Sequence, residues 1–380
     1  MQVRNSLFTF LLISALATYA APIPQAPSIS AKGHVLIDAS TGKVLSEFNG
    51  DELLPPASLT KIMTSYVAAV EIREGRINLA DQVPISVKAW RTPGSKTFVR
   101  EGTSVSLSDL LRGVIIQSGN DASVAVAEYI AGSEEAFAGM MNQHAEDIGM
   151  TRTDFRNSTG LPDKEHLTTA RDLVTLVRSL ISEFPDHYKI YSEREFTYGG
   201  IRQNNRNRLL WRDKTVDGVK TGMTKDAGFC LVASAMRGDM RLVSVVMGAT
   251  DDETRMRETQ KLFQWGFRYF ETQTLFEPDI NLQKVRIYYG EKEELELGIK
   301  EKLVLTFPRG SYEDLESEID FPRIIEAPIQ IDQKIGELRV NLDGQELASV
   351  PLIARSEVLE AGFFSRASDA IELFFSDLGE

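Results

Sequence analysis

PPASLTKIMTSYVAAVEI, residues 55–72, is an almost uncharged apolar run that begins with two prolines. Apolar residues on nearly every side of the helical wheel predict a helix, from about 57 to 74, that is buried in a globular domain. Ser58 and Lys61 are polar exceptions near the first turn of this helix. Residues three apart lie on the same helix face, so these two side chains can touch.

The pair suits an activated nucleophile. A serine hydroxyl reacts poorly until a neighbouring group accepts its proton. Burial lowers the pKa of a lysine because it disfavours the charged form, so Lys61 can act as the base for Ser58. The same spacing recurs in STGK at 40–43, between alternating segments that predict a β-hairpin, and we predict that this copy is an exposed turn.

Two further short motifs can supply polar groups to a site. SGN at 118–120 lies between two predicted helices, and KTG at 220–222 lies in a predicted strand. Taken alone, the first reads as a helix cap and the second as the solvent face of a strand. In a site, the serine of SGN would relay protons and its asparagine would hold a peptide group, while KTG would offer a charge and a hydroxyl to a carboxylate.

The N-terminal segment and the cysteine content indicate the cellular compartment of the protein. Residues 1–20 combine a basic flank, a short apolar core and small residues before a cleavage point, which predicts a secretory signal peptide. An uncleaved membrane anchor is the alternative, but the apolar core is short for a span. Cys230 is the only cysteine, so export occurs without internal disulfides, as is typical of a large bacterial periplasmic or cell-surface protein.

Charge and histidine placement argue against other classes of protein. The net charge of the chain is -13, and the sequence has no basic patch interleaved with aromatic residues. A nucleic-acid partner is therefore not expected. The four histidines have no ligand spacing, and neither a metal nor another cofactor is expected.

Strands at both ends and helices between them predict one mixed α/β domain whose first and last strands share a sheet. Beyond about residue 272, short alternating segments separated by Gly, Pro and Asp-Gly turns predict a smaller all-β domain. The last stretch, GFFSRASDAIELFFSDLGE, predicts an amphipathic helix with its phenylalanines on one face.

In this order and spacing, SLTK, SGN and KTG are the three signatures of penicillin-binding proteins and serine β-lactamases. The chain resembles the low-molecular-mass D-alanyl-D-alanine carboxypeptidases of the penicillin-binding protein 5 and 6 type along nearly its whole length. NRNRLLW and DDETRMRETQKLFQWGF resemble further segments of that family. The resemblance implies an α/β (α+β) β-lactamase/transpeptidase-like catalytic domain, with a helix cluster and an antiparallel sheet, followed by a small all-β domain.

The domain boundaries expected from this resemblance are 1–20 for the signal peptide, 21–271 for the catalytic domain, 272–360 for the all-β domain and 361–380 for a membrane-associating helix. The protein would lie on the periplasmic face of the bacterial inner membrane. Its implied partners are peptidoglycan stem peptides ending in D-Ala-D-Ala, β-lactam antibiotics and the membrane surface.

The resemblance also implies catalytic roles. Ser58 would attack the carbonyl of the penultimate D-Ala and form an acyl-enzyme, while Lys61 takes its proton. Ser118 and Lys220 would shuttle protons, and Asn120 would hold the substrate amide. Penicillins would acylate the same serine.

Other residues would bind the substrate. Thr221 and Arg255 would bind the terminal carboxylate, and Gly222 would let the substrate backbone lie close. The backbone N–H groups of Ser58 and Met223 would form the oxyanion hole. Arg206 lies where the family has an arginine near the site.

Two features depart from the family pattern. Met223 stands where family members often carry histidine after KTG, which removes any polar tuning of the neighbouring lysine by that side chain. The final helix carries one arginine against several acids, whereas interfacial helices usually have a basic polar face, so apolar burial would have to hold it.

Two other functions compete with the carboxypeptidase. A class A β-lactamase uses a loop glutamate to activate water. Glu165 is the nearest candidate, but its surroundings differ, and the middle residue of SGN is glycine rather than aspartate. A non-catalytic wall-binding scaffold would not need the intact set of reactive side chains. The same acylation also serves carboxypeptidase and endopeptidase cuts, and the sequence leaves both open.

Overall fold

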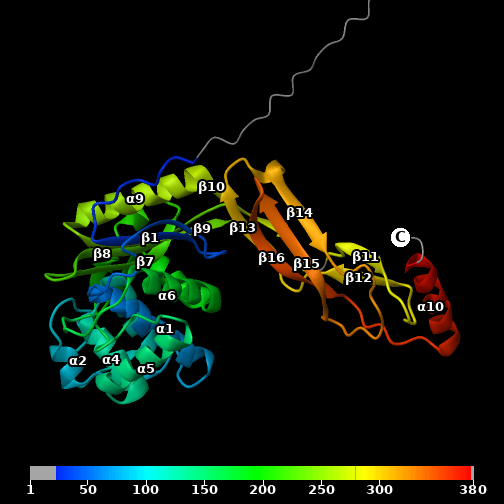
Figure 1. Ribbon diagram of the computed structural model, residues 1–380. Coiled ribbons are helices and arrows are strands. Elements are labelled where there is room, and N and C mark those ends of the chain that lie inside the picture. The colour runs from blue at the N-terminus through cyan, green and yellow to red at the C-terminus, as the bar shows by residue number, and fades with distance from the viewer. Residues whose placement is uncertain (1–22, 279, 378–380) are drawn as a thin grey trace, which may run out of the picture.

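The computed structural model describes residues 23–278 and 280–377, so the predicted signal peptide lies outside the described residues. Figure 1 shows a domain of helices and sheet beside an elongated β domain, with helix α10 (Phe363–Asp377) at the end of the β domain far from the first domain.

The larger domain is built on a five-stranded antiparallel sheet in the order β2-β1-β9-β8-β7. Its strands are β1 (Gly33–Asp38), β2 (Val44–Phe48), β7 (Val216–Thr224), β8 (Gly228–Arg237) and β9 (Met240–Ala249). Strand β1 pairs with β9, with Val35 opposite Val245. The expectation that the first and last strands share a sheet is therefore confirmed.

Alternate residues of β1 enter two separate cores. Val35 and Ile37 pack with helices α1 and α6 on one face, and Leu36 packs with α9 on the other. The longer helices are α1 (Lys61–Arg73), α4 (Asn120–Ala131), α5 (Glu134–Asp147), α6 (Ala170–Glu183) and α9 (Asp252–Tyr269). In Figure 1, α9 covers one face of the sheet and α1, α4, α5 and α6 lie on the other side. The period-two pattern of the strand thus produces the layered domain.

Two predicted helices are divided. The first helix begins as a 3₁₀ turn, η1 (Ala57–Thr60), and becomes α-helical at Lys61. The helix predicted before SGN is α3 (Leu107–Arg112) followed by a π turn, η2 (Gly113–Gln117). The shorter elements of this domain are α2 (Val87–Arg91), α7 (Pro185–Tyr188), η3 (Lys189–Ser192), α8 (Leu209–Arg212), β3 (Gln82–Pro84), β4 (Ser104–Ser106), β5 (Glu195–Tyr198) and β6 (Ile201–Asn204).

The second domain is a β structure followed by a helix. A five-stranded sheet in the order β11-β12-β16-β15-β14 accompanies the β10–β13 pair. The elements are β10 (Phe270–Phe276), β11 (Gln283–Arg286), β12 (Glu294–Gly298), β13 (Leu303–Pro308), η4 (Tyr312–Asp314), β14 (Leu315–Asp320), β15 (Lys334–Leu342), β16 (Gln345–Ala354) and α10 (Phe363–Asp377).

The hairpin turn at 40–43 joins the two domains. Thr41 Oγ1 lies 2.7 Å from Thr306 Oγ1, and Lys43 Nζ donates to the Thr306 carbonyl at 3.0 Å. Thr272 of β10 donates to the buried carboxylate of Asp38. The second Ser-x-x-Lys copy is therefore a turn, as predicted, but it packs on β13 instead of being simply exposed.

Candidate active site

Ser58 lies in η1, directly before the buried helix α1. Ala57 precedes it with a φ of 49°, in the left-handed region that non-glycine residues rarely adopt. Gly160 packs so closely here that a Cβ on it would lie 1.8 Å from the Ala57 carbonyl oxygen. The nucleophile candidate is thus mounted on a tightly held turn at the start of a rigid helix.

Lys61 is fully buried, and its amine has three neighbours. Nζ lies 2.7 Å from Asn120 Oδ1, 2.5 Å from the Thr159 carbonyl oxygen and 3.2 Å from Ser58 Oγ. Burial lowers the pKa of Lys61 to about 7, although the negative charges of Asp121 and Glu134 oppose the shift. A neutral amine has two N–H groups, which match the two carbonyl-type acceptors. Its lone pair is then left for the Ser58 hydroxyl.

Ser118 follows the π turn with a φ of 64°, and Asn120 begins α4. Asn120 accepts from Lys61 and donates from Nδ2 to the Pro93 carbonyl at 2.6 Å. Gly119 between them leaves room for Thr97, whose Oγ1 would lie 2.1 Å from an added Cβ. The SGN loop therefore connects Lys61 to the segment around residues 93–97.

Asp121, which the motif reading did not single out, fixes that same segment. It is fully buried, and its carboxylate accepts backbone N–H groups from Thr97, Phe98 and Val99 at 2.8, 2.9 and 3.3 Å. In the sequence it reads only as an acid in the first turn of a helix. Nothing local indicates that it holds a loop more than twenty residues away.

Strand β7 carries KTG along the opposite side of the site. Lys220 is 1% exposed and donates to the Thr221 carbonyl at 3.1 Å. Burial, with the charges of Lys61, Arg255 and Arg206, holds the pKa of Lys220 well below its usual range. A Cβ on Gly222 would lie 2.9 Å from the Pro56 carbonyl oxygen, so this glycine lets β7 approach η1.

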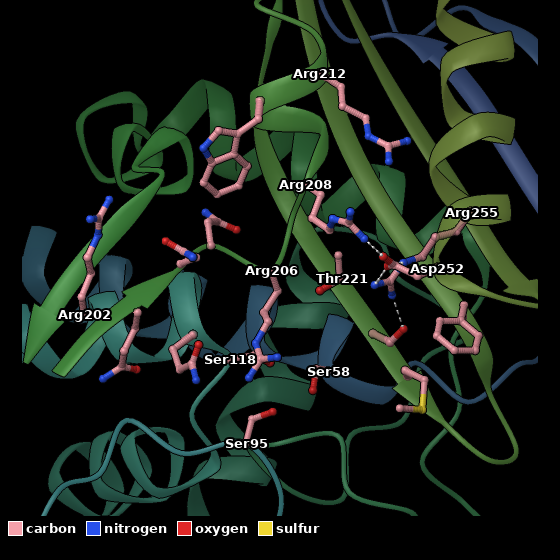
Figure 2. A pocket seen from close by; sticks show the side chains of 18 of the residues that line it. Ser58, Ser95, Ser118, Arg202, Arg206, Arg208, Arg212, Thr221, Asp252 and Arg255 are labelled. Atoms are coloured by element: carbon pink, nitrogen blue, oxygen red, sulfur yellow. Dashed lines mark hydrogen bonds and ion pairs between the residues drawn. The ribbon is translucent and has the colours of Figure 1, made fainter.

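The predicted residues surround one cleft of about 910 Å³ (Figure 2). Its lining includes Ser58, Ser118, Thr221, Gly222, Met223, Arg206 and Arg255. Lys61, Asn120 and Lys220 are buried beside this lining. Met223 is 57% exposed at the mouth of the cleft.

Arg255, which the resemblance assigns to the substrate carboxylate, is engaged in hydrogen bonds within the protein. Its Nη1 donates to the carbonyls of Gly222 and Cys230 at 2.9 and 3.0 Å, and its Nε donates to Asp252 at 2.9 Å. The side chain therefore braces β7 and β8 from α9. The Nε hydrogen and both Nη1 hydrogens are used in this brace, and Nη2 also donates to Asp252, which leaves one Nη2 hydrogen for another partner.

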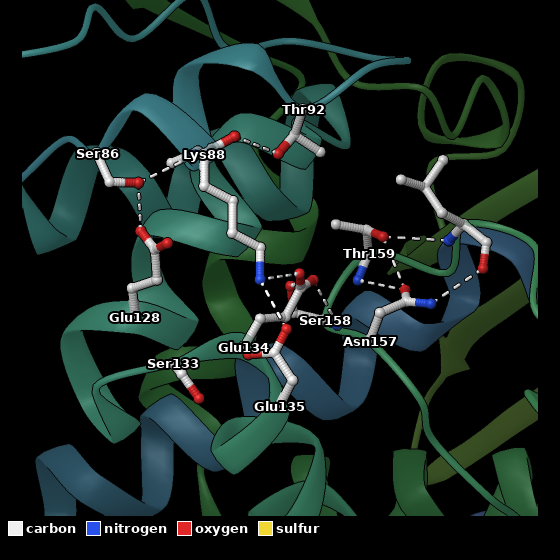
Figure 3. A network of polar contacts seen from close by, with 12 residues as sticks. Ser86, Lys88, Thr92, Glu128, Ser133, Glu134, Glu135, Asn157, Ser158 and Thr159 are labelled. Atoms are coloured by element: carbon white, nitrogen blue, oxygen red, sulfur yellow. Dashed lines mark hydrogen bonds and ion pairs between the residues drawn. The ribbon is translucent and has the colours of Figure 1, made fainter.

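Glu165, the candidate water activator of the β-lactamase alternative, is exposed and pairs with Arg156 at 3.2 Å. It is not among the residues that line the cleft. The acids that raise the pKa of Lys61 are Asp121 and Glu134, and Glu134 is held by Ser158 and Lys88 (Figure 3).

A buried lysine with a pKa of about 7 lies beside a serine at the start of a rigid helix. This is the arrangement of a serine enzyme that forms covalent intermediates. Comparison with known proteins identifies the class. The D-alanyl-D-alanine carboxypeptidase family profile matches residues 20–251, and the profile of the penicillin-binding protein 5 C-terminal domain matches residues 270–360.

Individual relatives agree with these profiles. D-alanyl-D-alanine carboxypeptidase DacC of Escherichia coli K12 is 44% identical over 376 residues, which cover 96% of this chain and 94% of the relative. The crystal structure of penicillin binding protein 5 from Haemophilus influenzae is 40% identical, with a TM-score of 0.85, and covers 89% of this chain and 100% of its own. Penicillin-binding protein D2 from Listeria monocytogenes, in its ampicillin-bound form, is 28% identical with a TM-score of 0.60, over 64% of this chain and 100% of its own.

The chain belongs to the D-alanyl-D-alanine carboxypeptidase family and is a serine hydrolase of that activity. The fold expected from the three motifs, a transpeptidase-like domain followed by a small β domain, is confirmed.

Proposed function

We propose that the protein removes the terminal D-Ala from peptidoglycan stem peptides through an acyl-enzyme on Ser58. The contacts of Lys61 are the observation that carries this proposal. Its amine is buried and has a pKa of about 7. In the neutral form, its two N–H groups donate to Asn120 Oδ1 and to the Thr159 carbonyl. The remaining lone pair can take the Ser58 proton as the hydroxyl attacks the penultimate D-Ala carbonyl.

The proton must then reach the leaving amine. Ser118 lines the cleft beside Ser58, and Lys220 is buried behind it with a strongly lowered pKa, so both can hold and pass on a proton. The backbone N–H groups of Ser58 and Met223 would stabilise the tetrahedral oxyanion. Asn120 keeps a second Nδ2 hydrogen for the substrate amide, and Gly222 leaves space for its backbone.

β-Lactams would acylate the same serine. The Listeria monocytogenes relative has been crystallised in ampicillin-bound and cefotaxime-bound forms, and it shares the fold of the domain that holds the cleft. A penicillin presents a strained amide to the nucleophile in place of the D-Ala-D-Ala bond, so we expect one adduct for each active site.

We further propose that the mature protein lies on the periplasmic face of the inner membrane through α10. Phe363, Phe364, Ile371 and Phe374 are 60–88% exposed along this helix. Among the described residues, no helix is long and apolar enough to cross a membrane. The side chain of Phe375, also expected on the apolar face, lies outside the described part of the chain.

Two acids of α10, Asp369 and Glu372, have partners on the β domain. Asp369 is 8% exposed and accepts from the Tyr289 backbone N–H at 2.6 Å and from Arg286 at 3.2 Å. Glu372 pairs with Arg286 at 3.3 Å. Asp369 is therefore buried against the β domain and Glu372 is paired with a cation, which supports interfacial binding by the apolar face despite the acidic composition.

D-Alanine release tests the enzymatic proposal. The purified mature protein should release one D-alanine from each pentapeptide ending in D-Ala-D-Ala, and Ser58→Ala should release none while keeping the same melting temperature. Sustained turnover by Ser58→Ala would refute the assignment of the nucleophile.

Vesicle flotation tests the membrane proposal. Phe363→Ser with Phe364→Ser should weaken partition by about a hundredfold or more, because each buried phenylalanine contributes roughly 1.5–3 kcal/mol. Ser365→Ala, on the same turn, is the control. Binding of the double variant equal to that of the control would rule the helix out as the anchor.

A further inference from the structure

His166 is a buried histidine behind the turn η1, which carries the nucleophile. It is 2% exposed and packs edge-on against Phe155, with 5.7 Å between the ring centroids. It is not among the residues that line the catalytic cleft. Its Nδ1 accepts from the Arg156 backbone N–H at 3.2 Å, and its Nε2 lies 2.9 Å from Thr60 Oγ1. Both ring nitrogens are therefore engaged inside the protein.

These partners fix the tautomer of His166. A backbone N–H can only donate, so Nδ1 is the acceptor and the neutral ring carries its proton on Nε2. Burial lowers the pKa of His166 to about 4, so the ring is neutral at neutral pH. The Thr60 hydroxyl donates its hydrogen to the Ala57 carbonyl at 2.8 Å. The Nε2–H group therefore donates to Thr60 Oγ1, and the hydroxyl passes the interaction on to Ala57.

The Ala57 carbonyl belongs to the same peptide group as the Ser58 N–H. A peptide group is planar and trans, so its C=O and N–H point in opposite directions. A hydrogen bond that fixes the Ala57 carbonyl therefore also fixes the direction of the Ser58 N–H. Ala57 has a φ of 49°, a conformation that is costly for a non-glycine residue and persists only when its surroundings hold it.

The segment that carries His166 also holds the turn and the base by other contacts. Gly160 packs against the Ala57 carbonyl, since a Cβ on this glycine would lie 1.8 Å from that oxygen. The neighbouring Thr159 carbonyl accepts from Lys61 at 2.5 Å. The position of this segment is thus coupled to both reacting groups, and His166 supplies its hydrogen bond to the turn.

We infer that His166 is a positioning residue for the oxyanion hole, which directs the Ser58 N–H through Thr60 and the Ala57 carbonyl. This step rests on the proposed function, in which that N–H is one of the two oxyanion donors. The ring N–H, the hydroxyl and the peptide group form one hydrogen-bonded chain, and the bonds of such a chain polarise one another. A fixed, polarised donor stabilises the charge that develops in the transition state more than it stabilises the bound substrate.

The separation of kcat from KM tests this inference, with a pentapeptide ending in D-Ala-D-Ala as substrate. His166→Phe fills the space but removes the donor. It should lower kcat about tenfold and change KM less than about twofold, a smaller loss than the roughly 10²–10³-fold cost of deleting an oxyanion donor. His166→Gln keeps one donor and one acceptor and should restore kcat to within about threefold of wild type. An unchanged kcat in His166→Phe, or a loss confined to KM, would overturn the inference.

A boronic acid analogue of the substrate gives a second measurement that a merely structural role would not move. Its tetrahedral adduct on Ser58 places an oxygen where the oxyanion forms. Because it resembles the transition state, its inhibition constant should rise in His166→Phe by the same factor of about ten by which kcat falls. A constant inhibition constant beside a lowered kcat would contradict a role in the oxyanion hole.

Thr60→Val tests the route by which His166 acts, because it removes the hydroxyl with little change of shape. It should lower kcat at least as much as His166→Phe. The double variant should be no slower than Thr60→Val alone, since both changes interrupt one chain. Losses that multiply in the double variant would refute the route.

His187→Phe is the matched control. His187 also bonds a hydroxyl of α1, Ser65 Oγ at 2.6 Å, but Ser65 lies further along the helix from the turn. This variant should leave kcat unchanged at a temperature below the melting temperature of every variant. A loss as large as that of His166→Phe would show that any damage around α1 slows the enzyme, and it would overturn the inference.

Penicillin labelling separates this inference from the proposed function. A wild type that forms no adduct on Ser58 would refute both. His166→Phe should still be labelled on Ser58, but about tenfold more slowly, because β-lactam acylation also develops charge on a carbonyl oxygen. Equal labelling rates in wild type and His166→Phe would overturn the inference and leave the proposed function standing.

Discussion

Removing the charge of Glu134 should move the pH dependence of acylation to lower pH. Glu134 is one of two acids that oppose the lowering of the Lys61 pKa. Its Oε1 accepts from the Ser158 backbone N–H at 3.1 Å and from Ser158 Oγ at 2.8 Å. Glu134→Gln keeps an oxygen for these bonds while removing the charge, so it changes the electrostatics with little change of shape.

The size of the effect follows from the pKa of Lys61. A nearby charge screened at an effective dielectric constant of about 20 contributes on the order of 1 kcal/mol, which is close to one pKa unit. With a pKa of about 7, roughly a tenth of Lys61 is neutral at pH 6. A pKa of about 6 makes roughly half neutral, so acylation at pH 6 should be about fivefold faster, with little change at pH 8.

The assay is the second-order rate of penicillin acylation, measured from pH 5 to 9, a range set to about two units on each side of a pKa of about 7. Glu135→Gln is the matched control. Its carboxylate also bonds Lys88 but is not among the groups that shift the pKa of Lys61 (Figure 3). A Glu134→Gln profile that is unchanged or moved to higher pH, or an equal shift in Glu135→Gln, would refute Lys61 as the titrating base.

Three other perturbations have defined outcomes. Gly119→Ala should slow penicillin acylation by at least about tenfold, because its Cβ would lie 2.1 Å from Thr97 Oγ1 and must displace that loop; an unchanged rate would contradict the packing. Thr272→Val should lower the free energy of unfolding by about 1–3 kcal/mol, measured by urea titration, since it removes a donor from buried Asp38; no loss would argue against that bond. Burial lowers the pKa of His187 to about 4, so the unfolded chain binds the extra proton between about pH 6.5 and 4, and stability should fall as pH falls through that range. His187→Gln should flatten the fall, and an equally steep fall would assign it to other groups.

The sequence could predict those parts of the site whose signal is local. Ser58 and Lys61 are three residues apart, and the helix pattern alone places them together. SGN and KTG are contiguous motifs, and their order along the chain identifies the family. The order of predicted elements, with strands at both ends of the domain and helices between them, likewise predicted that distant strands share a sheet.

Contacts between distant segments had no such signal. Asp121 holds the backbone of residues 97–99, and a single aspartate at a helix start does not reveal this. The brace made by Arg255 depends on the Gly222 and Cys230 carbonyls, which lie close to it only in the folded chain. For the same reason, the sequence alone made the acids of α10 look unfavourable for membrane binding. In the folded chain, Arg286 of the β domain pairs with Asp369 and Glu372.

Peptide mapping of the protein after reaction with penicillin tests the central claim most directly. The account predicts a single penicilloyl group on the peptide that contains Ser58, formed at a rate that rises with the neutral fraction of Lys61, and no adduct on Ser58→Ala. An adduct on another residue, or an unmodified Ser58 in an enzyme that still releases D-alanine, would contradict it.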